Sequence, residues 1–278
     1  MNGRTACAAV VAACLAATSP AGEPVRLAYR LASGDRIDMA VSHRALTETT
    51  VGATRQVTET ATDSTKTWRV VAVDATGRAT IEQSVDHVTM TSRTSDRGEV
   101  RWSSDDDAPP PPGYETVKQS LGVPLSRLVI DPAGRIIERR DLRPVPASST
   151  GDLVVVPLPD EPVAVGAVWT IPEEVVVEAA GSGRKAVRTR LRYQLESLDD
   201  GIATILVDTT VLTPIADPRL EARLLERIWR GTIRFDIAAG RVVSRSTAVD
   251  RRVVGFEGPE SSVRYKASLE ERLEPQPR

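Results

Sequence analysis

The sequence predicts an all-β protein, built as an antiparallel fold with one or two short helices. Segments rich in Val, Ile and Thr are broken at roughly ten- to fifteen-residue intervals by Gly, Asp or Pro, which is typical of strands and turns. Sustained helical periodicity is nearly absent. The 278 residues are 41% hydrophobic and 27% charged, an ordinary globular composition with a net charge of −2.

Two segments predict half-buried hairpins. Residues 67–74 and 78–85 flank a turn at 75–77, and Ala79 and Ile81 alternate with Thr80 and Glu82, so the strand has one apolar and one polar face. Residues 192–198 and 202–207 flank a similar Asp-Asp-Gly turn.

These hairpins are landmarks of two similar halves, each a curved sheet or partial barrel. Aligned on the turn glycines, Trp68 meets Tyr193 within about a residue, and Ile81 meets Ile205. The turns at 51–53 and 181–183 also correspond, as do residues 128–137 and 233–243. We therefore predict an internal duplication. It consists of an N-terminal β half (22–142), a linker (143–160), a C-terminal β half (161–274) and a tail (275–278).

Two stretches depart from the strand pattern. After the Asp-rich loop at 103–108 and four prolines, residues 114–121 contain enough helix formers for a short helix. Asp217 followed by Pro218 has the pattern of a helix N-cap and first turn. Because residues 228–235 again have a strand pattern, any helix there is expected to be short.

The first 21 residues have the layout of a secretory signal peptide. One basic residue, Arg4, precedes an uncharged small-apolar stretch at 5–17 and a cleavage region ending at Ala21. The apolar stretch is too short to span a bilayer. The alternative is lipidation, because residues 11–14 resemble a bacterial lipobox ending in Cys14. Since both cysteines lie in this leader, the mature chain is expected to contain no thiol or disulfide.

Composition argues against several function classes. The 36 Lys+Arg interleave with 38 Asp+Glu, so no basic stripe predicts nucleic-acid binding. In the hairpin register His43 and His87 oppose residues near 62 and 66, on the order of 15 Å apart, too far to share one zinc ion. Three consecutive carboxylates at 105–107 predict a solvated loop, with calcium binding as the weaker alternative.

The sequence contains no Gly-x-Ser-x-Gly elbow, phosphate-binding glycine loop, dinucleotide fingerprint or His-Glu-x-x-His motif, and it predicts no catalytic residue, metal or cofactor. Hydrolysis by paired carboxylates stays open, because any of the 38 acidic residues can meet in space. Four aromatic residues on strand segments have two interpretations, core packing or the lining of an apolar groove. They are Trp68, Trp169, Tyr193 and Trp229.

A short segment resembles a family of exported bacterial proteins. Residues 159–169 contain Pro-Val-x-Val-Gly-x-x-Trp, and Asp131 to Arg135 form an Asp-x-x-Gly-Arg turn that recurs, one residue longer, from Asp236 to Arg241. Both motifs are similar to those of exported, β-rich bacterial proteins of unknown function. The resemblance spans most of residues 25–274 and implies an exported β-rich fold, without an activity or catalytic residues.

The sequence therefore favours a non-enzymatic, exported binding or scaffold protein of the periplasm or envelope. A concave sheet face suits an apolar ligand such as a lipid, and an envelope protein is the other expected partner. One alternative is a carboxylate-dependent hydrolase in the cleft between the halves. The other is a structural or protein-interaction module.

Overall fold

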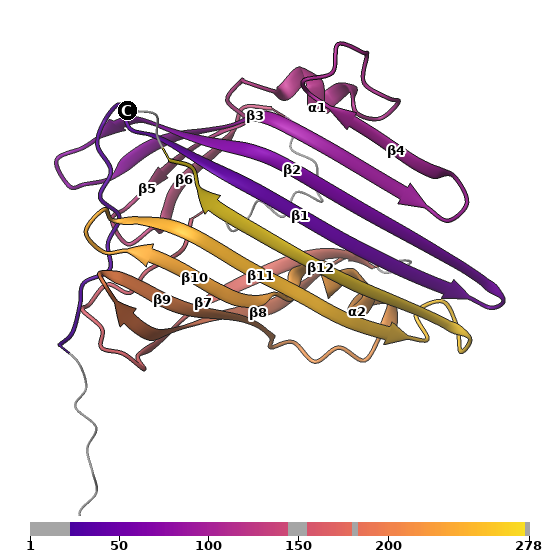
Figure 1. The fold of residues 1–278 in the computed structure, drawn as a ribbon. Helices are drawn as coiled ribbons and strands as arrows, with labels where there is room; N and C mark the ends of the chain where they lie inside the picture. Colours follow the sequence, from indigo (N-terminus) through magenta and orange to yellow (C-terminus); the bar gives the residue numbers. More distant parts are fainter. Residues whose placement is uncertain (1–22, 144–154, 180–182, 276–278) are drawn as a thin grey trace, which may run out of the picture.

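The computed structural model of the protein describes residues 23–143, 155–179 and 183–275. Their twelve strands form one antiparallel sheet, which confirms the predicted class. The order is β6-β5-β3-β2-β1-β12-β11-β10-β9-β8-β7, with β4 also paired to β3 (Figure 1). The strands before residue 143 are β1 (Arg36–Val51), β2 (Thr54–Val73), β3 (Ala79–Thr94), β4 (Gly98–Ser103), β5 (Ser126–Ile130) and β6 (Ile136–Asp141). The later strands are β7 (Val168–Ala179), β8 (Gly183–Asp199), β9 (Ile202–Val211), β10 (Arg230–Asp236), β11 (Arg241–Val254) and β12 (Ser261–Leu273).

The two predicted halves are joined through the middle of the sheet. β1 pairs with β12 from Met39↔Leu273 to Val51↔Ser261, so the first and last strands are neighbours. β1-β2-β3-β5-β6 and β7-β8-β9-β10-β11 each run as neighbouring antiparallel strands, in the order that the sequence landmarks require. The internal duplication itself stays a prediction. Of the predicted linker, residues 144–154 lie outside the described residues, as does most of the turn at 181–183.

The turns predicted at residues 75–77 and 199–201 are present between β2 and β3 and between β8 and β9. Between β2 and β3, the Asp74 carboxylate accepts hydrogen bonds from the amides of Thr76 and Arg78, at 2.8 and 3.0 Å. Between β8 and β9, Asp200 and Gly201 both have positive φ angles, 49° and 78°. Two consecutive left-handed residues match the right-handed twist of the flanking strands, so this hairpin closes without a longer loop.

Both predicted helices are present. α1 spans Glu115–Ser120, and α2 spans Pro218–Leu224 and continues as the short 3-10 helix η2 (Leu225–Arg227). The Asp217 carboxylate caps α2 by accepting a hydrogen bond from the Arg219 amide at 2.9 Å. Neither described helix has the length and apolar character needed to cross a bilayer.

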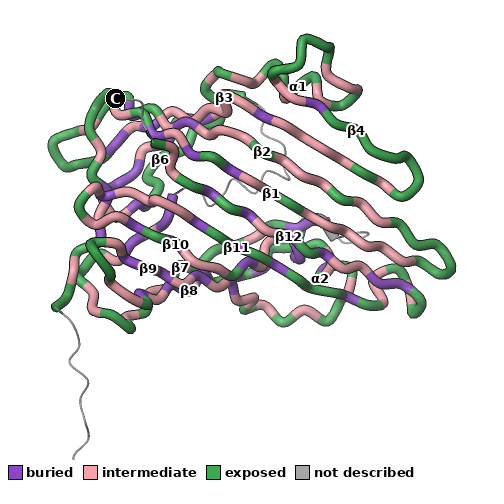
Figure 2. The backbone as a smooth tube through the Cα atoms, viewed as in Figure 1, coloured by how far each residue is buried: buried purple, intermediate pink, exposed green. Residues whose placement is uncertain are grey.

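The sheet curves strongly enough for its two ends to share a core. Ile81 on β3 and Leu128 on β5 lie in the same hydrophobic cluster as Leu195 on β8 and Ile205 on β9, although many strands separate them along the sheet. A second cluster lies where η2 packs against β1, β11 and β12. Along β11 and β12, buried residues alternate with more exposed ones, so the sheet has one apolar and one solvated face (Figure 2).

The described end of the predicted linker belongs to the core. Val155, Val156 and Leu158 are all buried in the cluster that joins the two ends of the sheet. The amide of Val156 donates a 3.0 Å hydrogen bond to the Tyr29 hydroxyl. This segment therefore packs between distant parts of the chain.

Candidate binding face on the curved sheet

The inner face of the sheet is the face that carries Met39, Val41 and Ala45 on β1. Cross-strand pairing extends it as rows, because directly opposed residues in antiparallel strands point to the same side. One row runs Val249, Ala267, Ala45 and Thr60. The next runs Thr247, Leu269, His43, Thr62, Met90 and Trp102.

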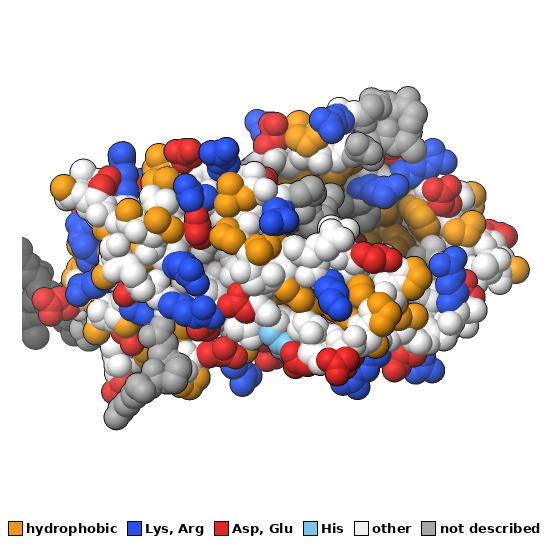
Figure 3. Space-filling view, turned by 90° about the horizontal axis from the view of Figure 1, so that it is seen from above, with side chains coloured by type: hydrophobic (Ala, Val, Ile, Leu, Met, Phe, Trp, Pro, Cys, Tyr) orange, Lys and Arg blue, Asp and Glu red, His pale blue; other side chains and the backbone are white. Residues whose placement is uncertain are grey.

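Only part of the inner face is covered by hydrophobic packing. Leu225 of η2 and Trp229 belong to one hydrophobic cluster with Val249 and Leu269, and along the first row this cluster extends as far as Ala45. Beyond it, Thr62 and Met90 continue the same rows and stay partly exposed. Seen from above, the molecule is hollowed behind its front strands, with hydrophobic side chains inside the hollow (Figure 3).

The four predicted aromatic residues do not line one groove. Trp169 stacks on Tyr193 with ring centroids 5.6 Å apart, and Tyr193 is almost fully buried in the core. Trp68 opposes Ile37 on β1, whereas the Trp229 ring lies 6.3 Å from that of His43, six residues further along β1. At ~3.3 Å per residue, the β1 residues that these two tryptophans approach lie about 20 Å apart. Trp229 borders the covered part of the inner face, just before β10 begins at Arg230.

The two histidines point to opposite faces. His43 opposes Thr62, as predicted, whereas a bulge near Thr65 places His87 opposite Thr65 on the outer face. Burial, and to a smaller extent Arg44, lower the pKa of His43. Its Nε2 atom is buried without a hydrogen-bond partner among the described residues.

A group of buried charges forms the polar end of the inner face. Lys66 Nζ lies 2.9 Å from Glu271 Oε1, and Arg245 Nε lies 2.8 Å from Glu271 Oε2. Burial alone would raise the pKa of Glu271, but Lys66 and Arg245 outweigh it and lower the pKa to about 2. Glu271 is therefore ionised at neutral pH. No sequence pattern indicated this group, because Lys66 and Glu271 are 205 residues apart.

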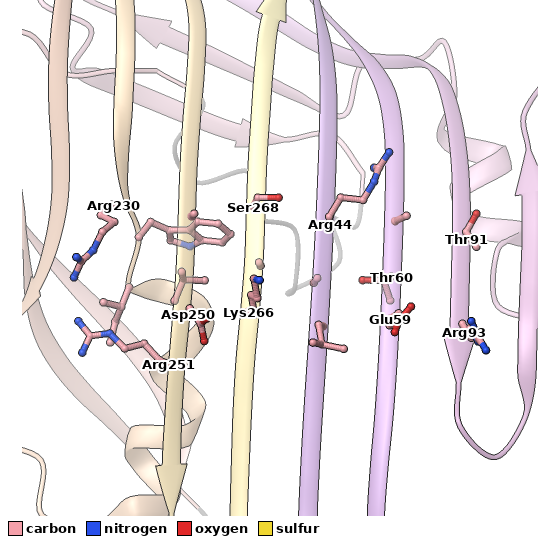
Figure 4. Close-up of a pocket in the computed structure, with 18 of the residues that line it drawn as sticks. Arg44, Glu59, Thr60, Thr91, Arg93, Arg230, Asp250, Arg251, Lys266 and Ser268 are labelled. Atoms are coloured by element: carbon pink, nitrogen blue, oxygen red, sulfur yellow. The ribbon is translucent and has the colours of Figure 1, made fainter.

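A trough with a volume of about 900 Å³ lies over the first row of the inner face: it is lined by Ala45, Thr60, Val249 and Ala267, by Trp229, and by neighbours of these residues along their strands. Most of its charged lining residues are exposed neighbours of these inner-face residues along the strands. They include Arg44, Glu59, Arg93, Arg230, Asp250 and Lys266 (Figure 4). Glu59 opposes Arg93 and Asp250 opposes Lys266, so opposite charges face each other across neighbouring strands. The trough therefore combines small and apolar inner-face residues with a charged border.

Two carboxylates approach one hydroxyl group on the outer face of β1–β3. The Thr67 hydroxyl oxygen lies 2.5 Å from Asp38 and 2.8 Å from Asp86, and Arg36 pairs with both carboxylates. Burial would raise the pKa of Asp86, but hydrogen bonds from Ser84, Thr67 and Arg36 lower it. General acid catalysis needs a carboxyl group that keeps its proton, and this arrangement instead favours the carboxylate.

The Asp-rich loop is held by local hydrogen bonds. Asp106 accepts a hydrogen bond from the Ser103 amide, and Asp105 lies 3.1 Å from Nδ1 of His87. Ser104 approaches the same ring nitrogen at 2.9 Å, so the three residues do not form a relay through both nitrogens of the imidazole. In the part of the chain that the structure describes, no three His, Cys, Asp or Glu side chains are grouped to hold a metal ion.

Comparison with known proteins identifies a fold likeness rather than a family. No protein-family model and no curated protein matches the sequence. A structure titled "Lipid-protein interactions in lipovitellin" matches with a TM-score of 0.51 and 12% identity, over 88% of this chain. DynF from the dynemicin biosynthesis pathway of Micromonospora chersina aligns over 92% of this chain and 88% of its own, at 7% identity and a TM-score of 0.23, too low to indicate a shared fold. The chain spans about a quarter of the lipovitellin chain, 26%, with which it shares a β-sheet fold.

Proposed function

We propose that the protein is a non-enzymatic lipid-binding protein that holds an apolar chain against the inner face of its sheet. One observation carries the proposal. The rows of small and apolar residues that begin under Trp229 continue past the packed cluster to Thr62 and Met90, where they stay partly exposed. A sheet face of small and apolar residues that stays partly exposed is suited to an apolar ligand.

The residue types on this face suit an acyl chain. Ala45, Thr60 and Thr62 are small, so a chain of methylene groups can lie close to the backbone, and Met90 adds a side chain that adapts its shape. Each methylene group removed from water contributes about 0.8 kcal/mol. Micromolar affinity corresponds to about 8 kcal/mol, so about ten buried methylenes are needed before the cost of association is added, and a long acyl chain can supply more than that number.

The fold likeness supports the same assignment. Lipovitellin is a protein whose structure is described in terms of lipid–protein interactions, and its matched part has this sheet fold. The likeness is one of fold, so it supports lipid binding without assigning a particular lipid.

We also propose that the protein acts outside the cytoplasm, in the periplasm or envelope, as its leader (residues 1–21) and the resemblance to exported bacterial proteins imply. These residues lie outside the described part of the chain. N-terminal sequencing of protein from its own host separates the two processing routes. A start at Gly22 supports simple cleavage, whereas a blocked, lipidated Cys14 supports anchoring to the envelope.

Native mass spectrometry of protein purified from its own host tests lipid binding. We expect a mass increment that is released by organic solvent and identified as a lipid. The variant Met90→Glu places a charge on the inner face and should abolish the increment. Thr91→Glu is the matched control, because the next residue on β3 points to the outer face and opposes Ala61.

Three outcomes distinguish the candidates. Lipid lost in Met90→Glu and kept in Thr91→Glu supports the proposal. The absence of lipid from all three proteins, together with a co-purifying envelope protein, would favour a protein-interaction module. Equal lipid content in both variants would place the ligand elsewhere and overturn the inner-face assignment.

A further inference from the structure

The inner face has one charged position that reaches both a cavity and the open part of the face. Lys66 on β2 pairs with Glu271, and its side chain stays 27% exposed. On the same strand, Ser64 and Thr62 carry the inner face on toward Met90. Thr62 is four residues from Lys66, about 13 Å along the strand.

One carboxylate serves two cations in this group. Lys66 donates a hydrogen bond to Oε1 of Glu271 and Arg245 donates one to Oε2, so both carboxylate oxygens already accept a hydrogen bond. Lys66 has three N–H donors, of which one is needed for Glu271. The other donors are available for a second oxygen ligand.

A small cavity adjoins this ammonium group. Its volume is about 40 Å³. Its charged lining residues are Lys66, Arg241, Arg245 and Glu271, and the rest of its lining is Tyr29 and the apolar residues Ile37, Met39, Trp68, Val156 and Val242. This volume suits a group of one or two water-sized atoms and is too small for a glycerophosphate head group. Three cations outnumber the one carboxylate in this lining, and apolar side chains complete it, which suits the end of an amphiphile whose head is anionic and compact.

We propose that the bound lipid is a long-chain carboxylic acid, with its carboxylate in the cavity beside Lys66 and its chain along the inner face toward Met90. This inference rests on the proposed function, because it specifies the ligand of the same face. Lys66 donates to the ligand carboxylate while it keeps its contact with Glu271. The acyl chain then lies along β2, on the small inner-face residues Ser64 and Thr62.

Paired titrations with palmitic acid and 1-hexadecanol test the head-group assignment, because the two probes have the same chain length and differ in the charged carboxylate. Binding is followed at pH 8 through tryptophan fluorescence. We expect the wild-type protein to bind the acid about tenfold more tightly than the alcohol, as one charge-assisted hydrogen bond provides. Lys66→Met should reduce this preference to about twofold or less, and Lys66→Arg should retain most of it.

Lys118→Met is the matched control, because Lys118 is exposed on α1, away from the inner face. Its acid preference should equal that of the wild type. If neither probe binds the wild-type protein, the proposed function fails. If both bind equally, lipid binding stands and the carboxylate assignment is overturned.

A preference for the acid that survives in Lys66→Met would likewise overturn the role of Lys66. If Lys66→Met does not fold, the proposal is tested by the ratio of acid affinity to alcohol affinity in the wild type and in Lys66→Arg. A tenfold ratio kept by the arginine variant supports the proposal, and a ratio near one in the wild type contradicts it.

Discussion

Replacing Glu271 with Gln tests whether the buried charges hold the middle of the sheet together. The substitution keeps the size of the side chain and removes its charge. Arg245, whose side chain is only 4% exposed, and Lys66 would then face a neutral amide. Removing one partner of a buried ion pair leaves an uncompensated charge, so we expect the free energy of unfolding to fall by about 3 to 5 kcal/mol at pH 7.

The pH dependence gives a second route to the same magnitude. The Glu271 pKa falls from its ordinary value of 4.5 to about 2 in the folded protein, because Lys66 and Arg245 outweigh the effect of burial. At ~1.4 kcal/mol per pH unit, this drop corresponds to about 3 kcal/mol of stability. Because the folded pKa is the lower one, this contribution is complete above pH 4.5 and is lost as pH falls toward 2.

Urea unfolding between pH 2 and 7, followed by tryptophan fluorescence, measures both effects. As the pH falls through this window, the free energy of unfolding of the wild type should decrease by about 3 kcal/mol more than that of Glu271→Gln. Glu270→Gln is the control, since Glu270 is exposed on the next position of β12 and pairs with exposed Arg272, so it should cost less than about 1 kcal/mol. A loss below about 1 kcal/mol in Glu271→Gln, or acid sensitivity equal to that of the wild type, would refute the reasoning.

The remaining predictions concern packing and caps. Ile205→Ala removes a side chain with no exposed surface and should cost about 2 to 5 kcal/mol in urea unfolding, whereas Leu206→Ala on the outer face should cost much less. Gly231→Ala should cost about 1 to 3 kcal/mol by the same assay, because its new Cβ would lie 2.0 Å from a carbonyl oxygen of β11; a wild-type midpoint would contradict this contact. Asp217→Ala should cost about 1 kcal/mol through loss of the α2 cap, and Asp217→Asn should restore most of it.

Local signals in the sequence predicted the hairpins and helices well. The Asp-Asp-Gly turn and the alternation around Ile81 depend on neighbouring residues, so a single sequence contains the information. The Asp217 cap followed by proline is also local, and α2 begins where this pair predicts.

The arrangement of the sheet as a whole was not predictable in the same way. The β1–β12 pairing and the Lys66–Glu271 contact join residues more than 200 positions apart, and no turn sets their register. The bulge that turns His87 to the outer face also has no sequence signal, because it compensates for curvature that arises only in the assembled sheet. The four aromatic residues were chosen by type, whereas the candidate face depends on small residues such as Thr62.

The central position of the β1–β12 pair determines when the protein can finish folding. During synthesis, residues 36–51 emerge early, but the strand that completes their second hydrogen-bonded edge is formed by residues 261–273. Until then β1 is an open edge next to a finished hairpin, exposed to wrong partners. Closing so long a loop is slow, so the native sheet forms only after nearly the whole chain has been released. A chaperone that masks β1 during that interval would therefore increase the yield of folded protein more than one acting on β7–β9, whose partners follow directly in sequence.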